Sequence, residues 1–196
     1  MALANLSGHT ALVTGAAQRL GRAIALALAQ DGANVVAHYR SSREEAEALR
    51  AELAGLGVCA WTVQADFADE AATAGLIDRV WDLCGPVSIL VNNASDFPPS
   101  TVQDVQWRDL QQQVAINAWA PFALSREFAR RAERGMIVNL LDSRLTSWDW
   151  SHVAYLWAKQ LLGHMTTHLA LAYAPNFTVN AVAPGLILPP PGQDEE

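Results

Sequence analysis

Hydrophobic positions follow two alternating patterns along this chain. Short, nearly continuous apolar runs alternate with longer segments in which apolar residues recur every three or four positions. The first pattern is typical of strands buried on both faces, and the second is typical of helices that pack along one face. Strands are predicted at 10–15, 34–39, 58–66, 87–95, 136–143 and 177–185. Helices are predicted at 19–32, 41–57, 69–85, 105–134 and 151–173.

Two local signals refine the predicted helices. Ser42 is followed three residues later by Glu45, which predicts a capping box at the start of the second helix. Pro121 lies inside the segment 105–134 and is expected to interrupt it, because proline lacks the backbone N–H that a helix interior needs.

The alternation of strand and helix predicts the fold class. It indicates an α/β fold of Rossmann type, a doubly wound parallel sheet with helices on both faces. Ligands of such sheets bind beyond the carboxyl ends of the strands. With 196 residues, 51% of them hydrophobic, residues 1–196 are expected to form one domain.

Composition and charge argue against several other classes. The net charge is −7 and no basic cluster is interleaved with aromatic residues, so neither nucleic acid nor an anionic membrane is an expected partner. Two cysteines and five histidines show no metal-ligand spacing, so no metal is expected. No apolar stretch is as long as a membrane span and no signal peptide is recognisable, which favours a cytoplasmic protein.

A turn containing two glycines, TGAAQRLGR at 14–22, lies between the first predicted strand and the first predicted helix. Backbone N–H groups and the positive end of the helix dipole would face a bound phosphate there. Gly15 allows the tight turn, and Gly21 allows the helix to pack closely on the strand. The position after a strand and before a helix favours a dinucleotide-binding turn over a merely structural one.

The end of the second predicted strand distinguishes between two cofactors. NAD-binding folds usually carry an acid there, whereas an arginine accommodates the 2′-phosphate of NADP. This chain has Arg40, Ser41 and Arg43 at that place and no acid, so NADP (NADPH) is predicted. Alternatively, the arginines only pair with the acids of the next helix, at 44, 45 and 47.

The stretch LLDSRLTSWDWSHVAYLWAK at 140–159 carries a second group of polar residues. Tyr155 and Lys159 are four residues apart and share one helix face, and the end of the preceding strand brings Asp142 to the same side of the sheet. A nearby ammonium group favours tyrosinate and is expected to lower the pKa of Tyr155, which would make the phenol a usable proton donor.

These motifs, in this order, resemble the short-chain dehydrogenase/reductase family along essentially the whole chain. The matching segments are TGAAQRLG, Asp66 after the third strand, NNAS at 92–95, Asn117 in the long helix, YLWAK at 155–159 and APG at 183–185. The resemblance implies a homodimer or homotetramer, with the helices that carry Asn117 and Tyr155 at the interface.

The resemblance also implies residue roles. Tyr155 would be the general acid or base, Lys159 would bind the nicotinamide ribose, Asn117 would hold a relay water, and Asp142 completes the catalytic group. The cofactor would contact Gly15, Arg19, Leu20, Gly21, His38, Arg40, Ser41, Asp66, Asn93, Ala94, Tyr155, Lys159, Pro184 and Gly185.

Two departures from the common family pattern point to a branch. Arg19 replaces the middle glycine of the turn, and Asp142 replaces the usual catalytic serine, thirteen residues before the tyrosine. Together with HYRSS and an aromatic residue two positions after NNAS, they resemble the pteridine reductase and dihydromonapterin or dihydrofolate reductase branch. In that branch Phe97 would stack on the pterin ring, and the other substrate contacts would be Arg19, Ser95, Asp142 and Tyr155.

A carboxylate at position 142 suits a nitrogen heterocycle. It could accept hydrogen bonds from ring N–H groups or, if partial burial raises its pKa, share in protonating a ring nitrogen. Alternatively, Asp142 is a helix cap or a surface partner of Arg144.

The leading hypothesis is an NADPH-dependent reductase of a dihydropterin, pteridine or dihydrofolate-type substrate. The alternatives are a short-chain carbonyl or 3-oxoacyl reductase and a non-catalytic nucleotide-binding protein. The family continues beyond the sixth strand with a substrate-covering segment and a seventh strand. We therefore expect the sequence to be truncated there.

Overall fold

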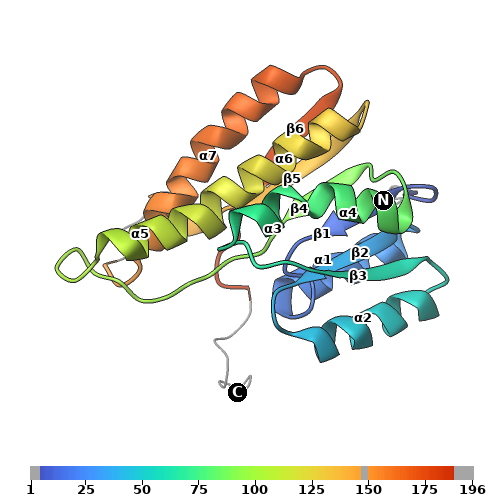
Figure 1. Ribbon diagram of the computed structural model, residues 1–196, viewed down its shortest axis with the longest axis horizontal. Helices are drawn as coiled ribbons and strands as arrows, with labels where there is room; N and C mark the ends of the chain where they lie inside the picture. Colours follow the sequence, from blue (N-terminus) through green and yellow to red (C-terminus); the bar gives the residue numbers. More distant parts are fainter. Residues whose placement is uncertain (1–4, 147–149, 188–196) are drawn as a thin grey trace.

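The computed structural model describes residues 5–146 and 150–187. They form a parallel sheet with the strand order β3-β2-β1-β4-β5-β6 and helices on both faces (Figure 1). The strands are β1 (Thr10–Val13), β2 (Asn34–Tyr39), β3 (Ala60–Gln64), β4 (Ile89–Asn92), β5 (Gly135–Leu140) and β6 (Phe177–Val182). The order confirms the predicted doubly wound fold, whose switch point lies between β1 and β4.

Helices cover the sheet in two layers. They are α1 (Arg19–Gln30), α2 (Arg43–Gly55), α3 (Glu70–Ala74), α4 (Leu76–Cys84), α5 (Trp107–Val114), α6 (Ala120–Arg131) and α7 (Val153–Tyr173). Successive residues of a strand point to opposite faces, so each strand contributes to both cores. Leu12 packs in the core that includes residues of α4, α6 and α7, whereas Ala11 and Val13 pack in the core that includes residues of α1 and α2.

The β6 side of the sheet exposes apolar surface. In the described residues β6 pairs with β5 and has no strand beyond it. On the α1 side of the sheet, an apolar groove of about 370 Å³ runs past β4, β5 and β6. The expected truncation after the sixth strand, and the seventh strand that would follow it, are not tested by the structure and stay predictions.

The predicted helix at 69–85 is two helices. α3 ends before Gly75 and α4 begins after it, and the side chain of Asp69 caps α3 by accepting hydrogen bonds from the amides of Ala71 and Ala72. Glycine is costly inside a helix, which explains why the break lies at this residue.

The predicted interruption near Pro121 takes the form of a π-helical turn. This turn, Ala115–Trp119, separates α5 from α6 and ends just before the proline. Proline has no N–H to donate to the carbonyl four residues earlier, here that of Asn117, so the regular ladder cannot continue through this turn. The chain accommodates the gap with wider turns, and Asn117 lies in the middle of them.

The predicted capping box at Ser42 is wrong. Ser42 precedes α2, but its side chain makes no capping hydrogen bond, and Glu45 accepts one from Gln18 instead. Tertiary contact with the turn before α1 therefore takes the carboxylate that local sequence would place at the cap. A reciprocal capping box forms at α5, between Gln106 and Asp109.

No helix in the described part of the chain combines the length and the apolar character needed to cross a membrane.

Candidate functional site

The turn between β1 and α1 offers backbone N–H groups to a ligand. Gln18 precedes α1 and provides no side-chain cap, since its amide donates to Glu45, and the first turn of α1 contains no acid. The first N–H groups of a helix have no partner within the helix, and the helix dipole makes this end positive. The turn can therefore receive an anion such as a phosphate.

Steric contacts explain both glycines of this turn. Gly15 has φ +62°, and a Cβ added there would lie 2.8 Å from the Cα of Ala94. A Cβ added to Gly21 would lie 2.1 Å from the carbonyl oxygen of Gly15. Arg19 has φ +50°, a conformation that favours glycine. It therefore replaces the middle glycine of the family pattern while keeping a backbone geometry typical of glycine.

Hydrogen bonds connect this turn to the ends of β2 and β4. His38 Nδ1 accepts from the amide of Gly15 at 3.0 Å, while its Nε2 lies 3.1 Å from the carbonyl oxygen of Ala65. Because Nδ1 accepts, Nε2 carries the proton and the imidazole is neutral. Directly after β4, Asn93 donates through its side chain to the carbonyls of Thr14 and Gly15.

Burial keeps His38 neutral. The residue is 2% exposed and stacks on Phe67 with 4.4 Å between ring centroids. This burial lowers its pKa from 6.5 to about 4. His38 was predicted to contact the cofactor; it also supports the turn that would bind the phosphates.

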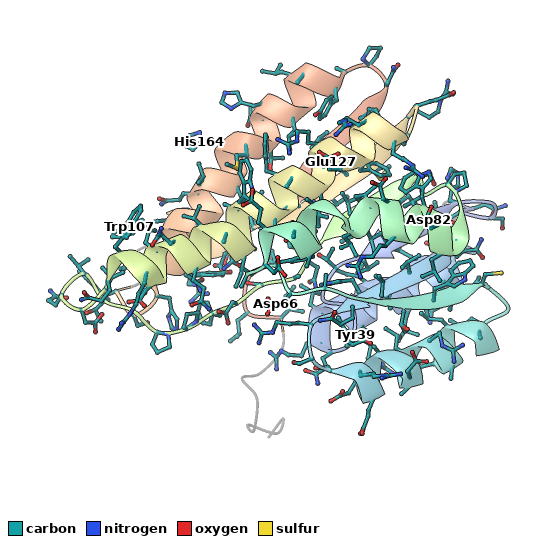
Figure 2. The ribbon with its side chains drawn as sticks, in the orientation of Figure 1. Tyr39, Asp66, Asp82, Trp107, Glu127 and His164 are labelled. Carbon is teal, nitrogen blue, oxygen red and sulfur yellow. The ribbon has the colours of Figure 1, made fainter. Side chains whose placement is uncertain are left out.

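A cleft of about 510 Å³ follows the carboxyl ends of β1 to β4. Its lining includes most of the predicted cofactor residues: Gly15, Arg19, Leu20, Gly21, His38, Arg40, Ser41, Asp66, Asn93 and Ala94. Ser95 and Phe97, predicted to contact substrate, line the same cleft. Asp66 and Tyr39, both labelled in Figure 2, mark the ends of β3 and β2 in this lining.

The acids beside Arg40 and Arg43 have other partners. Glu45 accepts from Gln18, and Glu47 accepts from Arg50 and Thr62. These hydrogen bonds to Glu47 lower its pKa most, but the charge of Arg43 also contributes to the lowering. The alternative, in which the arginines at the end of β2 only pair with these acids, therefore stays an alternative.

The second group of predicted residues meets beside this cleft. The hydroxyl of Tyr155 donates to Asp142 Oδ2 at 2.9 Å, and Arg144 donates to the same carboxylate from Nε at 3.0 Å and from Nη2 at 2.7 Å. The amide of Arg144 also donates to Asp142 Oδ1 at 2.8 Å, which caps the short 3₁₀ helix Ser143–Thr146. Asp142 is thus both the cap and partner of Arg144 and a direct neighbour of the tyrosine.

The pKa values in this group differ from those predicted. Burial and the adjacent Asp142 carboxylate raise the pKa of Tyr155 well above its usual value, although Arg144 and Ser95 act in the opposite direction. Partial burial alone would raise the pKa of Asp142, but hydrogen bonds from Arg144 and Tyr155 outweigh it and hold this pKa below its ordinary range. The predicted lowering of the Tyr155 pKa is therefore wrong for this arrangement, and the raised pKa that Asp142 would need to share in protonating a ring nitrogen is not found.

Lys159 is fully enclosed next to the tyrosine. It is 2% exposed, and its Nζ donates to the carbonyl of Leu140 at 2.7 Å and lies 5.8 Å from the centroid of the Tyr155 ring. Burial lowers the pKa of Lys159 to about 8. The ammonium donates to the carbonyl at the end of β5 and not to the Tyr155 hydroxyl, so burial and the Asp142 carboxylate decide the direction of the tyrosine pKa.

Asn117 connects the π-helical turn to the loop after β4. Its side chain is completely buried, accepts from the Ser95 hydroxyl at 2.8 Å, and donates to the carbonyl of Asp96 and the side chain of Gln113. Such π-helical turns occur frequently at functional sites. Asn117 therefore fixes the loop that carries Ser95 and Phe97.

Phe97 lies against the same group. Its ring stacks on His152 with centroids 3.7 Å apart, meets the Tyr155 ring edge-on at 4.6 Å, and lies under the Arg144 guanidinium at 4.7 Å. Its exposed fraction of 42% leaves part of the ring available to a ligand. Sequence reasoning missed His152, because nothing in its local pattern indicates a stacking partner far away in the chain.

A backbone clamp explains how Phe97 reaches His152. Ser100 donates to the carbonyl of Ser151 at 2.7 Å and accepts from the amide of Val153 at 3.0 Å, and its hydroxyl accepts from the amide of Ala154. The loop after β4 is thereby attached to the start of α7. This attachment brings the predicted substrate platform beside the predicted proton donor.

The loop after β6 lies next to Asp142 without lining the cleft. The amide of Ser143 donates to the carbonyl of Pro184 at 3.1 Å, and a Cβ added to Gly185 would be 3.8 Å from the Ser143 hydroxyl. The site thus has two adjacent parts. One is the cleft with the predicted cofactor residues, and the other is the group of Asn117, Asp142, Tyr155 and Lys159. Pro184 lines the apolar groove instead.

Comparisons with known proteins agree with this architecture. Versicolorin reductase stcU of Emericella nidulans is 35% identical over 185 residues, which covers 93% of this chain and 70% of that protein. The 3-oxoacyl-[acyl-carrier-protein] reductase FabG of Staphylococcus aureus is 32% identical, over 91% of this chain and 74% of that protein.

A solved structure matches both the fold and the sequence. The crystal structure of FolM alternative dihydrofolate reductase 1 from Brucella canis, complexed with NADP, superposes with a TM-score of 0.90 at 33% identity. The match covers 97% of this chain and 76% of that one. Residues 9–195 match the short chain dehydrogenase family. The chain therefore belongs to the short chain dehydrogenase family.

Proposed function

We propose that this protein is an NADPH-dependent reductase of a dihydropterin or a related dihydrofolate-type substrate, with Tyr155 as the proton donor. The observation that carries the proposal is the hydrogen bond from Tyr155 to the Asp142 carboxylate, directly beside the partly exposed ring of Phe97. An aromatic platform, a carboxylate and a phenol suit a flat nitrogen heterocycle.

The cleft residues fit NADPH. The uncapped start of α1 suits the pyrophosphate, Arg40 and Ser41 at the end of β2 suit the 2′-phosphate, and Asp66 would contact the adenine. Bound NADPH would supply the hydride. Lys159, enclosed between α7 and the end of β5, would bind the nicotinamide ribose.

The protonation states of Tyr155 and Asp142 bear on these roles in different ways. The raised pKa keeps the Tyr155 phenol protonated at neutral pH, so it holds a proton, but it also makes the phenol a weaker acid. Bound cofactor and substrate would have to lower this pKa for Tyr155 to donate its proton. The lowered pKa keeps Asp142 ionised, so it accepts from the phenol and from Arg144. An N–H group of the heterocycle would bind this carboxylate in place of one of these donors. Asn117 would hold the loop that presents Ser95 and Phe97.

The similarity to a FolM alternative dihydrofolate reductase supports this substrate class. The similarity to versicolorin reductase and to a 3-oxoacyl reductase supports the alternative, a carbonyl reductase acting on a ketone. The two candidate functions require different roles of residue 142. A carboxylate suits ring N–H groups, whereas a developing alkoxide is stabilised by a neutral hydrogen-bond donor.

The test is NADPH oxidation with a panel of dihydropterins, dihydrofolate and ketones, run on the parent protein and on Asp142→Ser. We expect the parent to reduce a dihydropterin or dihydrofolate, and Asp142→Ser to lose most of that activity. Tyr155→Phe is the catalytic control and should reduce the rate by about a hundredfold or more, the usual contribution of general acid catalysis.

Consumption of NADPH with ketones but not with pterins would support the carbonyl reductase instead. An Asp142→Ser variant with unchanged pterin activity would contradict the role given to the carboxylate. NADPH binding without turnover of any substrate would support the non-catalytic alternative.

A further inference from the structure

One residue outside the family motifs contacts three members of the proposed site. The guanidinium of Arg144 forms a two-pronged ion pair with Asp142, lies 4.7 Å from the Phe97 ring centroid and lies 5.9 Å from the Tyr155 ring centroid. Its side chain is 35% exposed, and that of Asp142 is only 12% exposed. Arg144 therefore connects the carboxylate, the phenol and the aromatic platform.

The ion pair determines the direction of the carboxylate. A guanidinium that donates from Nε and Nη2 fixes both the position and the plane of a carboxylate, which a single hydrogen bond would not do. In this orientation Asp142 Oδ2 accepts from Arg144 at 2.7 Å and from Tyr155 at 2.9 Å at the same time. Arg144 thus acts on the tyrosine through the carboxylate.

The same guanidinium supports the aromatic platform. Phe97 has His152 stacked on it at 3.7 Å with an angle of 10° between the rings. Arg144 also lies over this ring, in the geometry of a cation–π contact. Withdrawal of the guanidinium would therefore loosen both the carboxylate and the phenylalanine ring.

We propose that Arg144 is a positioning residue of this site, which orients Asp142 toward the Tyr155 hydroxyl and holds Phe97 in place for the substrate. The inference rests on the proposed reductase function for its kinetic consequence only. Its structural consequence, the state of the Asp142 carboxyl, can be measured without any substrate.

The backbone geometry allows a clean variant. The amide of residue 144 donates to Asp142 Oδ1 whatever side chain follows it, so Arg144→Met keeps the cap of the 3₁₀ helix and removes only the guanidinium. Arg144→Lys keeps the positive charge but cannot donate two parallel hydrogen bonds to the carboxylate. Arg126→Met is the matched control, because Arg126 also pairs with a carboxylate, that of Glu127. It also lies over two rings, those of Trp119 at the end of the π-helical turn and of Phe122 on α6.

The first measurement is the titration of the Asp142 carboxyl in the substrate-free protein, by NMR of carboxyl-labelled aspartate assigned with Asp142→Ser. In Arg144→Met we expect the pKa of Asp142 to rise relative to the parent, because the guanidinium no longer opposes burial, while the amide of residue 144 and the Tyr155 hydroxyl still donate to the carboxylate. Arg126→Met should titrate like the parent. The second measurement is steady-state kinetics, in which kcat should fall about tenfold to a hundredfold, as for a misplaced reacting group, while the Kd for NADPH is unchanged.

The outcomes separate the two claims. An unchanged Asp142 titration in Arg144→Met would overturn the inference whatever the substrate is, and so would parent-like kcat on an accepted substrate. A shifted titration in a protein that reduces no pterin would support the structural part and contradict the proposed function. If Arg144→Met does not fold, Arg144→Lys takes its place in both measurements. A small rise in the pKa of Asp142 with a reduced kcat supports the inference, and parent-like values of both overturn it.

Discussion

The two sides of the site are held by different kinds of contact. On the nucleotide side, backbone groups of the β1–α1 turn meet the backbone and fixed side chains of β2 and β4, as in the bonds from Gly15 to His38 and from Asn93 to Thr14. On the substrate side, side chains meet side chains, as in the group of Asp142, Arg144 and Tyr155.

This difference predicts that the nucleotide side is rigid and that the chemistry of the substrate side can change by single substitutions. A site made of backbone tolerates no added atom, because the sheet fixes the positions of its parts. A site made of side chains changes its charge and shape with single substitutions while the fold stays the same. Each side holds residues of the family motifs, the glycines of the turn on one and Tyr155 on the other. The departures Arg19 and Asp142 are both side chains, which single substitutions can change without moving the backbone.

The largest effect is expected at the glycine with the closest backbone contact. Gly21→Ala places a Cβ against the carbonyl of Gly15 and should cost about 3 kcal/mol of stability, the upper part of the range for overpacking. NADPH binding should weaken with it. Chemical denaturation and fluorescence titration with NADPH measure the two effects.

The matched control is Gly55→Ala, at the end of α2, where an added Cβ meets nothing within 4 Å. It should be as stable as the parent or more stable, because alanine is the better helix former. Equal behaviour of the two variants would show that the turn can relax, contrary to the rigid side of the comparison.

A pH effect of intermediate size is expected from His38. Its pKa is about 4 in the folded protein and 6.5 in the unfolded chain, so the unfolded chain binds more protons between these values. Stability should therefore fall as the pH decreases from about 6.5 to about 4, with a loss of about 2 kcal/mol between about pH 7 and about pH 5. Denaturation at the two pH values measures this loss.

The variant His38→Gln should show a smaller difference between the two pH values, since glutamine does not titrate. His164→Gln, on the exposed surface of α7 (Figure 2), should keep the full difference of the parent. A His38→Gln variant with the parental pH dependence would place the titrating group elsewhere.

A smaller effect is expected at the exposed end of β2. Arg40→Ala should reduce the preference for NADPH over NADH by about tenfold, because it removes a charged partner of the 2′-phosphate at a site where water screens the interaction. The ratio of kcat/KM for the two cofactors measures the preference. Arg50→Ala, which breaks only the pair with Glu47, should leave the ratio unchanged.

The smallest effect is expected on the substrate side. Phe97→Leu keeps an apolar side chain but loses aromatic stacking, so the substrate KM should rise about fivefold, equivalent to about 1 kcal/mol. The Kd for NADPH should not change. Phe122→Leu, whose ring contacts Trp119 and not the Tyr155 ring, should leave the substrate KM as it is. A rise in KM there would indicate a general loss of stability.

Local pattern was sufficient for the fold and for the nucleotide side. Runs of apolar residues marked the strands, and the turn at 14–22 was predicted from its place between a strand and a helix. The end of β2 was identified in the same way, because parallel strands bring their carboxyl ends to one edge of the sheet. Arg40, predicted from the end of β2, lines one cleft together with Asp66 and Asn93, which the family resemblance implied.

Tertiary structure decided the state of the groups on the substrate side. From sequence, Lys159 should lower the pKa of Tyr155; in the folded protein the carboxylate of Asp142 and burial raise it, while Lys159 donates to the carbonyl of Leu140. His152 as a partner of Phe97 had no sequence signal at all. The physical reason is the distance along the chain over which each property is set. Periodicity and strand ends depend on residues that are neighbours in the sequence. Desolvation and charge pairing depend on every group that the fold brings near.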